Sequence, residues 1–228
     1  MSKQEYDLRY VNKNGRKPIF FSSDWHIGHE NSIKFDNRPF KDLDEMHRKL
    51  IANYNAQVPE NGICYFLGDI ATHSSDLTRG ILEKLNGVKI IIVGNHDKSS
   101  NALYGMGFDV VLNNATIYID GQRVTMSHCP LPGIFREDVS DMKGAVLGDN
   151  WHGESKHQAF MVPNEGQFHL HGHLHSPNHG KSKKIVNRQY DVGLPANNYR
   201  PVSISEISSW ISKTLYEEKQ QSEKKDGI

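Results

Sequence analysis

Short apolar runs rich in β-branched and aromatic residues recur along the chain, and they limit the fold more than any other feature. They occupy residues 19–21, 63–67, 88–93, 110–112, 116–119, 124–126, 168–170 and 185–192. Several are nearly continuous in apolar residues, which is typical of strands that are covered on both faces. The sequence therefore predicts a sheet buried between other layers.

Helical patterns lie between the first of these runs. Asp42 and Glu45 form a capping box, which predicts a helix of roughly 12 to 15 residues with its apolar positions on one face. Residues 77–85 form a second helical pattern that a glycine closes. Asp120-Gly121 then predicts a two-residue hairpin between two strands. We expect an α/β fold in which alternating strands and helices give way to antiparallel pairing.

The chain as a whole predicts one domain. Ser205 can cap a last helix, and the charged residues 217–228 after it are expected to fray. No stretch rich in Pro, Gly or Ser divides the chain, so we expect a single domain at residues 18–216 after a polar segment at residues 1–17. The long aperiodic stretch at residues 130–167 is typical of a functional loop or a lid.

Charge and hydropathy exclude several classes of protein. The 27 Lys and Arg residues balance 27 Asp and Glu residues, so no overall field attracts duplex nucleic acid or an anionic membrane. No apolar run approaches the roughly 20 residues of a membrane span, and the polar N-terminal segment lacks the apolar core of a signal peptide. We therefore expect a cytoplasmic protein with no membrane partner.

Side chains that bind metals or transfer protons follow directly after several of the apolar runs. These segments are Asp24-Trp25-His26, Gly68-Asp69, Gly94-Asn95-His96-Asp97, His128 and Gly172-His173-Leu174-His175. Taken singly, each is also what a turn, a helix cap or a solvated histidine-rich loop contains. In open α/β sheets, however, ligands bind at the C-terminal ends of the strands, so the segments together favour one shared site.

The donor count in these segments favours two metal ions. Three oxygen donors and four imidazoles are available: Asp24, Asp69, Asn95, His26, His128, His173 and His175. A mononuclear catalytic zinc site needs only three protein ligands, so the surplus indicates a dinuclear site with a bridging carboxylate. Two cations about 3.5–4 Å apart suit phosphoester hydrolysis, because they can hold a phosphoryl oxygen and activate water together.

These segments resemble the sequence pattern of the calcineurin-like metallophosphoesterase superfamily, which is D-x-H, G-D, G-N-H-D or G-N-H-E, a lone His and G-H-x-H. Residues 23–31, Arg38-Pro39-Phe40 and residues 198–203 are further similar to a group of small bacterial and phage phosphoesterases. The likeness spans about residues 18–207. It implies a fold in which two mixed sheets form a β-sandwich flanked by helices, in four layers. For a phage-encoded member, the expected location is the host cytoplasm.

The resemblance also implies a role for each residue of the site. One metal would be bound by Asp24, His26 and His175, the other by Asn95, His128 and His173, and Asp69 would bridge the two. His96 would lie beside the scissile phosphate, stabilising it or protonating the leaving oxygen, and Asp97 would orient the His96 imidazole. The expected cofactors are two divalent ions of manganese, iron or zinc.

One departure from the pattern concerns the binding of phosphate. Protein phosphatases of the superfamily continue the second block as G-D-x-x-D-R-G, whereas this chain continues as G-D-I-A-T-H. The arginine that grips a phosphomonoester is thus missing, and Arg38 or Arg79 would have to replace it. His29 and Asn31 could line the pocket or merely stabilise their loop. Further candidates in the long aperiodic stretch are Trp151, as a base-stacking or a buried structural residue, and His152.

Two further histidines and both cysteines are expected to take no part in the chemistry. His47 and His157 are expected to face solvent on helices, Cys64 to be a buried free thiol in a strand, and Cys129 to be a packing residue. The sequence thus predicts a metal-dependent phosphodiesterase acting on a nucleotide-like or other small phosphoester. A phosphomonoesterase or single-strand nuclease is the alternative, and a non-catalytic scaffold of the same fold is a third. The balanced charge weighs against a duplex nuclease.

Overall fold

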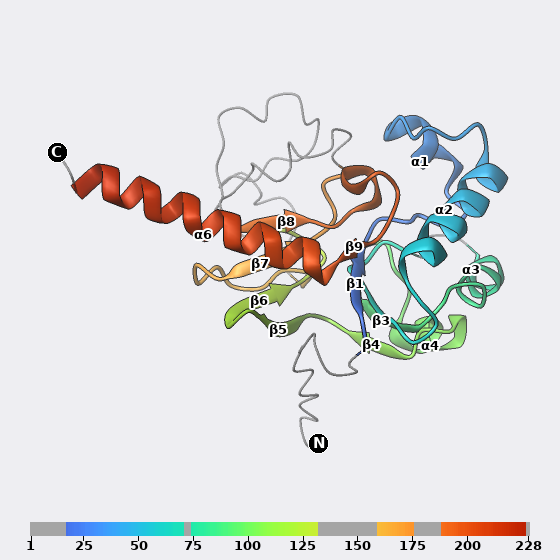
Figure 1. Cartoon of the computed structure of the whole chain (residues 1–228). Coiled ribbons are helices and arrows are strands. Elements are labelled where there is room, and N and C mark those ends of the chain that lie inside the picture. The colour runs from blue at the N-terminus through green and yellow to red at the C-terminus, as the bar shows by residue number, and fades with distance from the viewer. Residues whose placement is uncertain (1–16, 71–73, 132–158, 176–187, 227–228) are drawn as a thin grey trace, which may run out of the picture.

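The computed structural model describes residues 17–70, 74–131, 159–175 and 188–226, which form two mixed β-sheets and five α-helices (Figure 1). Trp151, His152, His157 and most of the predicted polar N-terminal segment lie outside the described residues. Within the described part of the chain, no helix combines the length and the apolar character that crossing a bilayer requires.

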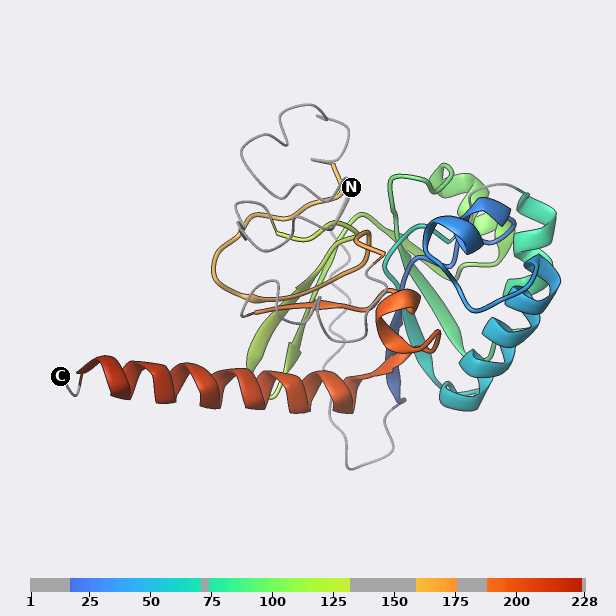
Figure 2. The ribbon, with the colours of Figure 1, turned by 90° about the horizontal axis from the view of Figure 1, so that it is seen from above.

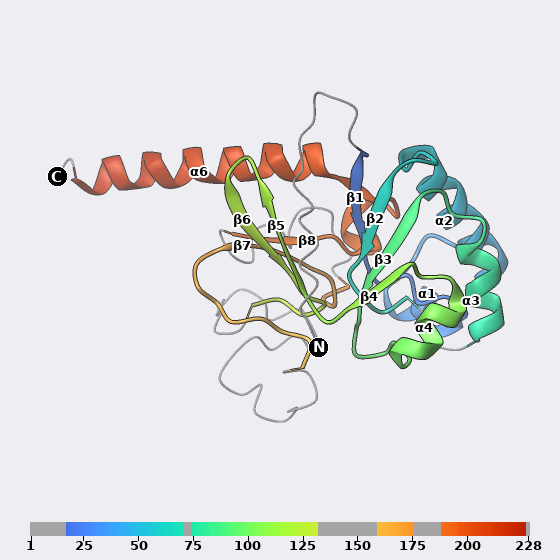
Figure 3. The ribbon, with the colours of Figure 1, turned by 90° about the horizontal axis from the view of Figure 1, so that it is seen from below.

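The first sheet has five strands in the order β4-β3-β2-β1-β9. Its parallel strands are β1 (Ile19–Ser22), β2 (Ile63–Phe66), β3 (Val88–Ile92) and β4 (Val110–Leu112), and β9 (Val202–Ser203) pairs antiparallel with β1. The helices that connect them are α1 (Glu30–Phe35), α2 (Leu43–Gln57), α3 (Ser75–Leu82) and α4 (Ser100–Met106). Figure 3 shows these helices on the side of the sheet that faces away from the second sheet.

The second sheet has four strands in the order β5-β6-β7-β8. The strands are β5 (Ala115–Ile119), β6 (Gln122–Met126), β7 (Phe168–His171) and β8 (Gln189–Asp191). β5 and β6 form the predicted antiparallel hairpin, in which Asp120 and Gly121 have φ values of 49° and 76°, as a two-residue turn of the primed type requires. β6, β7 and β8 pair in parallel, so their C-terminal ends share one edge.

Both faces of the first sheet are buried, as the apolar runs predicted. Phe20 of β1 packs in a cluster with Met46 and Leu50 of α2, whereas its neighbour Phe21 belongs to a cluster that includes Leu170 of the second sheet. The alternation follows from strand geometry, because successive side chains point to opposite faces. One hydrophobic core therefore lies beneath the helices, and another joins the two sheets.

The C-terminal helix α6 (Ile204–Asp226) differs from the expectation at both ends. Ser203 and Glu206, rather than Ser205, form a capping box: the Glu206 N–H donates to Ser203 Oγ, and the Ser203 N–H to Glu206. The helix also continues past residue 216, where fraying was expected, and Figure 2 shows this part extending beyond the sheets. An ion pair between Arg188 and Glu218 and i,i+4 pairs along the helix support it.

Candidate metal centre

The predicted ligand segments come together because their strands end at neighbouring edges. The N–H of Asp24, after β1, donates to the carbonyl of Gly68, after β2, over 3.1 Å. The N–H of Gly172, after β7, donates to the carbonyl of His128, after β6, over 2.9 Å. The two sheets meet through Asp24, whose carboxylate accepts a hydrogen bond from the His173 N–H at 3.0 Å. Four segments that are far apart in the sequence thus meet at one place.

The backbone of the site is strained at many of the predicted ligands. Non-glycine residues rarely adopt positive φ, and such residues cluster at functional sites, where the surrounding structure holds them. The ligands with positive φ are Asp24 (61°), His26 (49°), Asp69 (55°), His173 (71°) and His175 (47°). This strain indicates that the loops are shaped to aim side chains at a common point, at a cost that the rest of the fold offsets.

Glycines of the sequence motifs lie directly beneath the carboxylates. A Cβ atom at Gly172 would overlap Ser23 Oγ and Asp24 Oδ2, and one at Gly94 would overlap Asp69 Oδ1. Only glycine allows the backbone to approach these side chains so closely. The two glycines therefore allow the backbone to pack directly against the side chains of Asp24 and Asp69.

The first donor group consists of Asp24, His26, Asp69 and His175, whose potential ligand atoms all lie within 4.8 Å of one another. His26 Nε2 lies 2.9 Å from His175 Nε2, and the latter lies 3.4 Å from Asp24 Oδ1. Nitrogen and oxygen donors of these types at these spacings could share one divalent cation.

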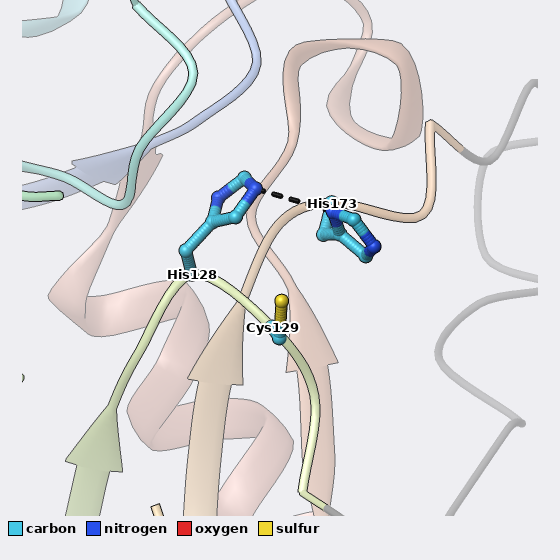
Figure 4. Close-up of side chains that lie close together, drawn as sticks. All are labelled: His128, Cys129 and His173. Carbon is cyan, nitrogen blue, oxygen red and sulfur yellow. Dashed lines mark hydrogen bonds between the residues drawn. The ribbon is translucent and has the colours of Figure 1, made fainter. Parts of the chain in front are cut away.

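The second donor group surrounds His128. Its Nε2 lies 3.0 Å from Asn95 Oδ1 and 3.2 Å from His173 Nδ1. Figure 4 shows His128 and His173 together, with Cys129 beside them, and the three form a further group of potential ligand atoms. Burial, with the charges of Asp69 and Asp24, raises the pKa of the Cys129 thiol. A neutral thiol is a poor ligand, which favours the packing role expected for Cys129.

Asp69, a member of the first donor group, also lies close to the second. Its Oδ2 atom is 3.9 Å from His26 Nε2 and 3.4 Å from His128 Nε2. Its Oδ1 atom accepts a hydrogen bond of 2.9 Å from the backbone N–H of His96, which fixes the orientation of the carboxylate. A single carboxylate oxygen thus lies close to nitrogen donors of both groups, a position from which it could bridge two cations.

The electrostatics of the site fit cations. Burial alone would raise the pKa values of Asp24 and Asp69, but the neighbouring histidines outweigh burial and hold both values below the usual range. Burial alone would likewise lower the pKa values of His175 and His128, yet the aspartates raise them to about 10 and about 9. Positive charge close by thus stabilises the ionised form of these buried carboxylates. Divalent cations would supply that charge while leaving the imidazoles neutral, as metal ligands must be.

The predicted catalytic residues flank this centre. His96 is exposed, and its ring centroid lies 6.0 Å from that of His26. Asp97 accepts hydrogen bonds from the backbone N–H groups of Asp69, Ile70 and Gly94, at 2.8, 2.9 and 2.8 Å. Its carboxylate therefore joins two ligand loops. That Asp97 also orients the His96 imidazole stays a prediction.

Both candidate arginines make contacts within the fold, and the expectation that one of them grips phosphate stays a prediction. Arg38 is only 4% exposed and donates to the carbonyls of Trp25 and Asp24, at 3.1 and 3.0 Å, and to the Asp36 carboxylate. Arg79 is exposed on α3 and donates to the carbonyl of Gly105 at 2.8 Å. Arg38 thus stabilises the backbone of the first ligand segment.

The remaining candidates lie at different distances from the centre. His29 is half-buried, with its ring centroid 5.8 Å from that of His26, and Asn31 is exposed on α1. His47 does not simply face solvent, because its Nε2 accepts a hydrogen bond of 3.2 Å from the Gly28 N–H. Sequence reasoning missed Asp36, which contacts His175. The sequence feature closest to Asp36 was the segment Arg38-Pro39-Phe40, which begins two residues later.

The fold and the donor groups thus define an α/β protein of two mixed sheets with candidate metal-binding clusters. No family model matches the chain. It belongs to the same family as the uncharacterized protein MJ1445 of Methanocaldococcus jannaschii, to which it is 31% identical over 202 residues, covering 86% of this chain and 93% of that protein. It is also 30% identical over 214 residues to the gene 66 protein of Mycobacterium phage L5, covering 87% and 96% of the two chains.

A solved structure shares the fold. The protein of unknown function AQ665 from Aquifex aeolicus superposes with a TM-score of 0.61 at 25% identity, covering 85% of this chain and 99% of that one. An archaeal phosphodiesterase gives a TM-score of 0.33 at 17% identity over 68% of this chain and 72% of that one, a similarity too low to support an inference.

Proposed function

We propose that the protein is a dinuclear metal-dependent phosphoesterase of the calcineurin-like type, and that it hydrolyses phosphodiesters of a nucleotide-like or other small kind. The observation that carries the proposal is the position of Asp69, whose Oδ2 faces His26 on one side and His128 on the other. A bridging carboxylate is required only where two cations lie close together.

The proposed ligands come from the two donor groups. Asp24, His26, Asp69 and His175 would hold one cation, and Asp69, Asn95, His128 and His173 would hold the other. Mixed carboxylate, amide and imidazole donors suit Mn²⁺, Fe²⁺ and Zn²⁺. When bound, two such cations supply Lewis acidity toward the phosphoryl oxygens and toward water.

The chain's own residues would supply the proton. His96 is exposed beside the donor groups, and its backbone N–H is held by Asp69, so its side chain can reach a substrate oxygen. From there it would donate a proton to the leaving oxygen or stabilise the phosphoryl charge through a hydrogen bond. Asp97 would keep the two loops that carry Asp69 and His96 in register.

The contacts of the two candidate arginines favour a phosphodiester as the substrate. A phosphomonoester is a dianion near neutral pH and gains from an additional arginine, whereas a diester carries one negative charge. Arg38 and Arg79 are both used within the fold. A phosphomonoesterase or single-strand nuclease therefore stays the second choice.

The proposed superfamily also implies a sandwich of the two sheets. Two observations support it: Tyr65 and Leu67, in and just after β2, share a hydrophobic cluster with Val124 and Leu170 of the second sheet, and α6 contributes Ile207 and Ile211 to the same cluster. The opposite face of the first sheet packs against helices in the other cluster.

The test is a substrate screen on metal-loaded protein. Protein loaded with Mn²⁺, Fe²⁺ or Zn²⁺ should hydrolyse bis(p-nitrophenyl) phosphate faster than p-nitrophenyl phosphate, and a nucleotide panel would then narrow the substrate. Asp69→Asn should abolish the activity, while Asp76→Asn, a change at an exposed aspartate on α3, should not. Protein that binds two metals per chain but hydrolyses neither ester would exclude the enzyme in favour of a scaffold.

A further inference from the structure

Asp36 connects a predicted metal ligand to a buried arginine. Its Oδ1 atom lies 2.9 Å from His175 Nδ1, and its Oδ2 atom accepts from Arg38 Nε and Nη2 at 3.0 and 2.8 Å. The Asp36 and Arg38 side chains are 7% and 0% exposed, so water competes little for these contacts. Asp36 is the residue that ends α1, outside all the ligand segments.

These contacts form a closed ring that passes through two members of the first donor group, Asp24 and His175. Arg38 Nη2 also donates to the backbone carbonyl of Asp24 at 3.0 Å, and Asp24 Oδ1 lies 3.4 Å from His175 Nε2. The ring therefore ties His175, at the end of the ligand series, to Asp24, at its start. The two nitrogens of the His175 ring face different partners: Nδ1 faces Asp36, and Nε2 faces the donor group.

We propose that Asp36 is a positioning residue that holds the His175 imidazole with its proton on Nδ1, so that Nε2 presents a lone pair to the metal. The inference rests on the proposed metal centre. A carboxylate only accepts hydrogen bonds, so the nitrogen that faces it must carry the proton. In metal sites, such carboxylate partners fix the tautomer and the orientation of the ligating ring.

Because Arg38 occupies Oδ2 of Asp36, the tautomer of His175 depends on the other oxygen, Oδ1. Guanidinium only donates hydrogen bonds, so an asparagine at position 36 would turn its oxygen toward Arg38 and its NH₂ group toward His175. His175 Nδ1 would then have to accept, and the proton would move to Nε2, the atom that faces Asp24 and His26. The change is nearly isosteric, yet it would block the coordinating nitrogen.

The experiment measures metal binding directly. Wild-type protein and Asp36→Asn are titrated with Zn²⁺ and with Co²⁺ against a chromophoric chelator, and the visible absorption of bound Co²⁺ is recorded. We expect one of the two ions to bind about 10- to 100-fold more weakly in the variant, with an altered Co²⁺ spectrum, and the other ion to bind as in wild type. Asp36→Glu, which only accepts hydrogen bonds, should recover part of the affinity.

A matched control separates positioning from folding. Glu206→Gln removes another carboxylate that is paired with an arginine, Arg200, and it should leave the binding of both ions unchanged. Thermal melts of the metal-free proteins check that all variants fold. If wild type binds two ions and Asp36→Asn binds both with unchanged affinity, the positioning role is wrong and the metal centre stands. If wild type binds neither ion, the metal centre and the inference fall together.

Discussion

At the scale of single residues, the site combines strain, burial and charge. Asp24 and Asp69 are buried with positive φ, and each is ionised because histidines surround it. His96 differs from them, since it is exposed and lies beside the donor groups without belonging to either. It is therefore the residue whose removal should separate catalysis from metal binding.

His96→Ala should keep the fold and both metal ions but lose rate by about 10²- to 10⁴-fold, the usual contribution of a positioned general acid. The loss should be greater for alkyl esters than for a nitrophenyl diester, because nitrophenolate leaves without protonation. Steady-state kinetics on the two kinds of ester measure this difference. Equal losses would make His96 a stabiliser of phosphate charge, and no loss would remove it from the mechanism.

At the scale of elements, loops placed at strand ends build the site, and caps fix the helices around it. Gly172 after β7 lies against Ser23 and Asp24, so the loop that carries His173 and His175 has room for a hydrogen atom only. Ser203 and Glu206 cap the N-terminus of α6 through two reciprocal hydrogen bonds. The two sets of contacts involve different residues, so each can be tested without disturbing the other.

Gly172→Ala should push the loop away from Asp24 and weaken metal binding strongly, because its Cβ would overlap a ligand oxygen. Gly80→Ala, in α3, is the matched control: a Cβ there meets no atom within 4 Å. It should leave metal binding intact and stabilise the protein by about 0.5–1 kcal/mol. Metal titration and urea unfolding measure the two effects. Unchanged metal affinity in Gly172→Ala would show that the close approach is not required.

Ser203→Ala should lower the free energy of unfolding by about 0.5–2 kcal/mol, because the Glu206 N–H loses its acceptor at the start of α6. Metal binding should not change, since α6 carries none of the proposed ligands. Ser209→Ala serves as the control, because the Ser209 hydroxyl only bonds back to the carbonyl of Ser205 within the helix. Equal destabilisation by both changes would argue against the capping box.

At the scale of the whole molecule, local patterns in the sequence predicted the hairpin and every described strand except the short β9, and the polar residues after the strands predicted the donor groups. Contacts between residues far apart in the sequence could not be predicted from these local patterns. Burial of Arg38 depends on Asp36 and on carbonyls more than ten residues away, which no local pattern reports. The extent of α6 was missed because its ion pair between Arg188 and Glu218 joins distant segments.

The central claim is that Asp69 bridges two cations in a site built by both sheets. Elemental analysis of protein reconstituted with Mn²⁺ or Zn²⁺ tests it most directly. We predict two ions per chain in wild type, and a loss of bound metal together with most activity in Asp69→Asn, with an unchanged circular dichroism spectrum. One ion or none in wild type, or two ions and near-wild-type turnover in Asp69→Asn, would contradict the claim.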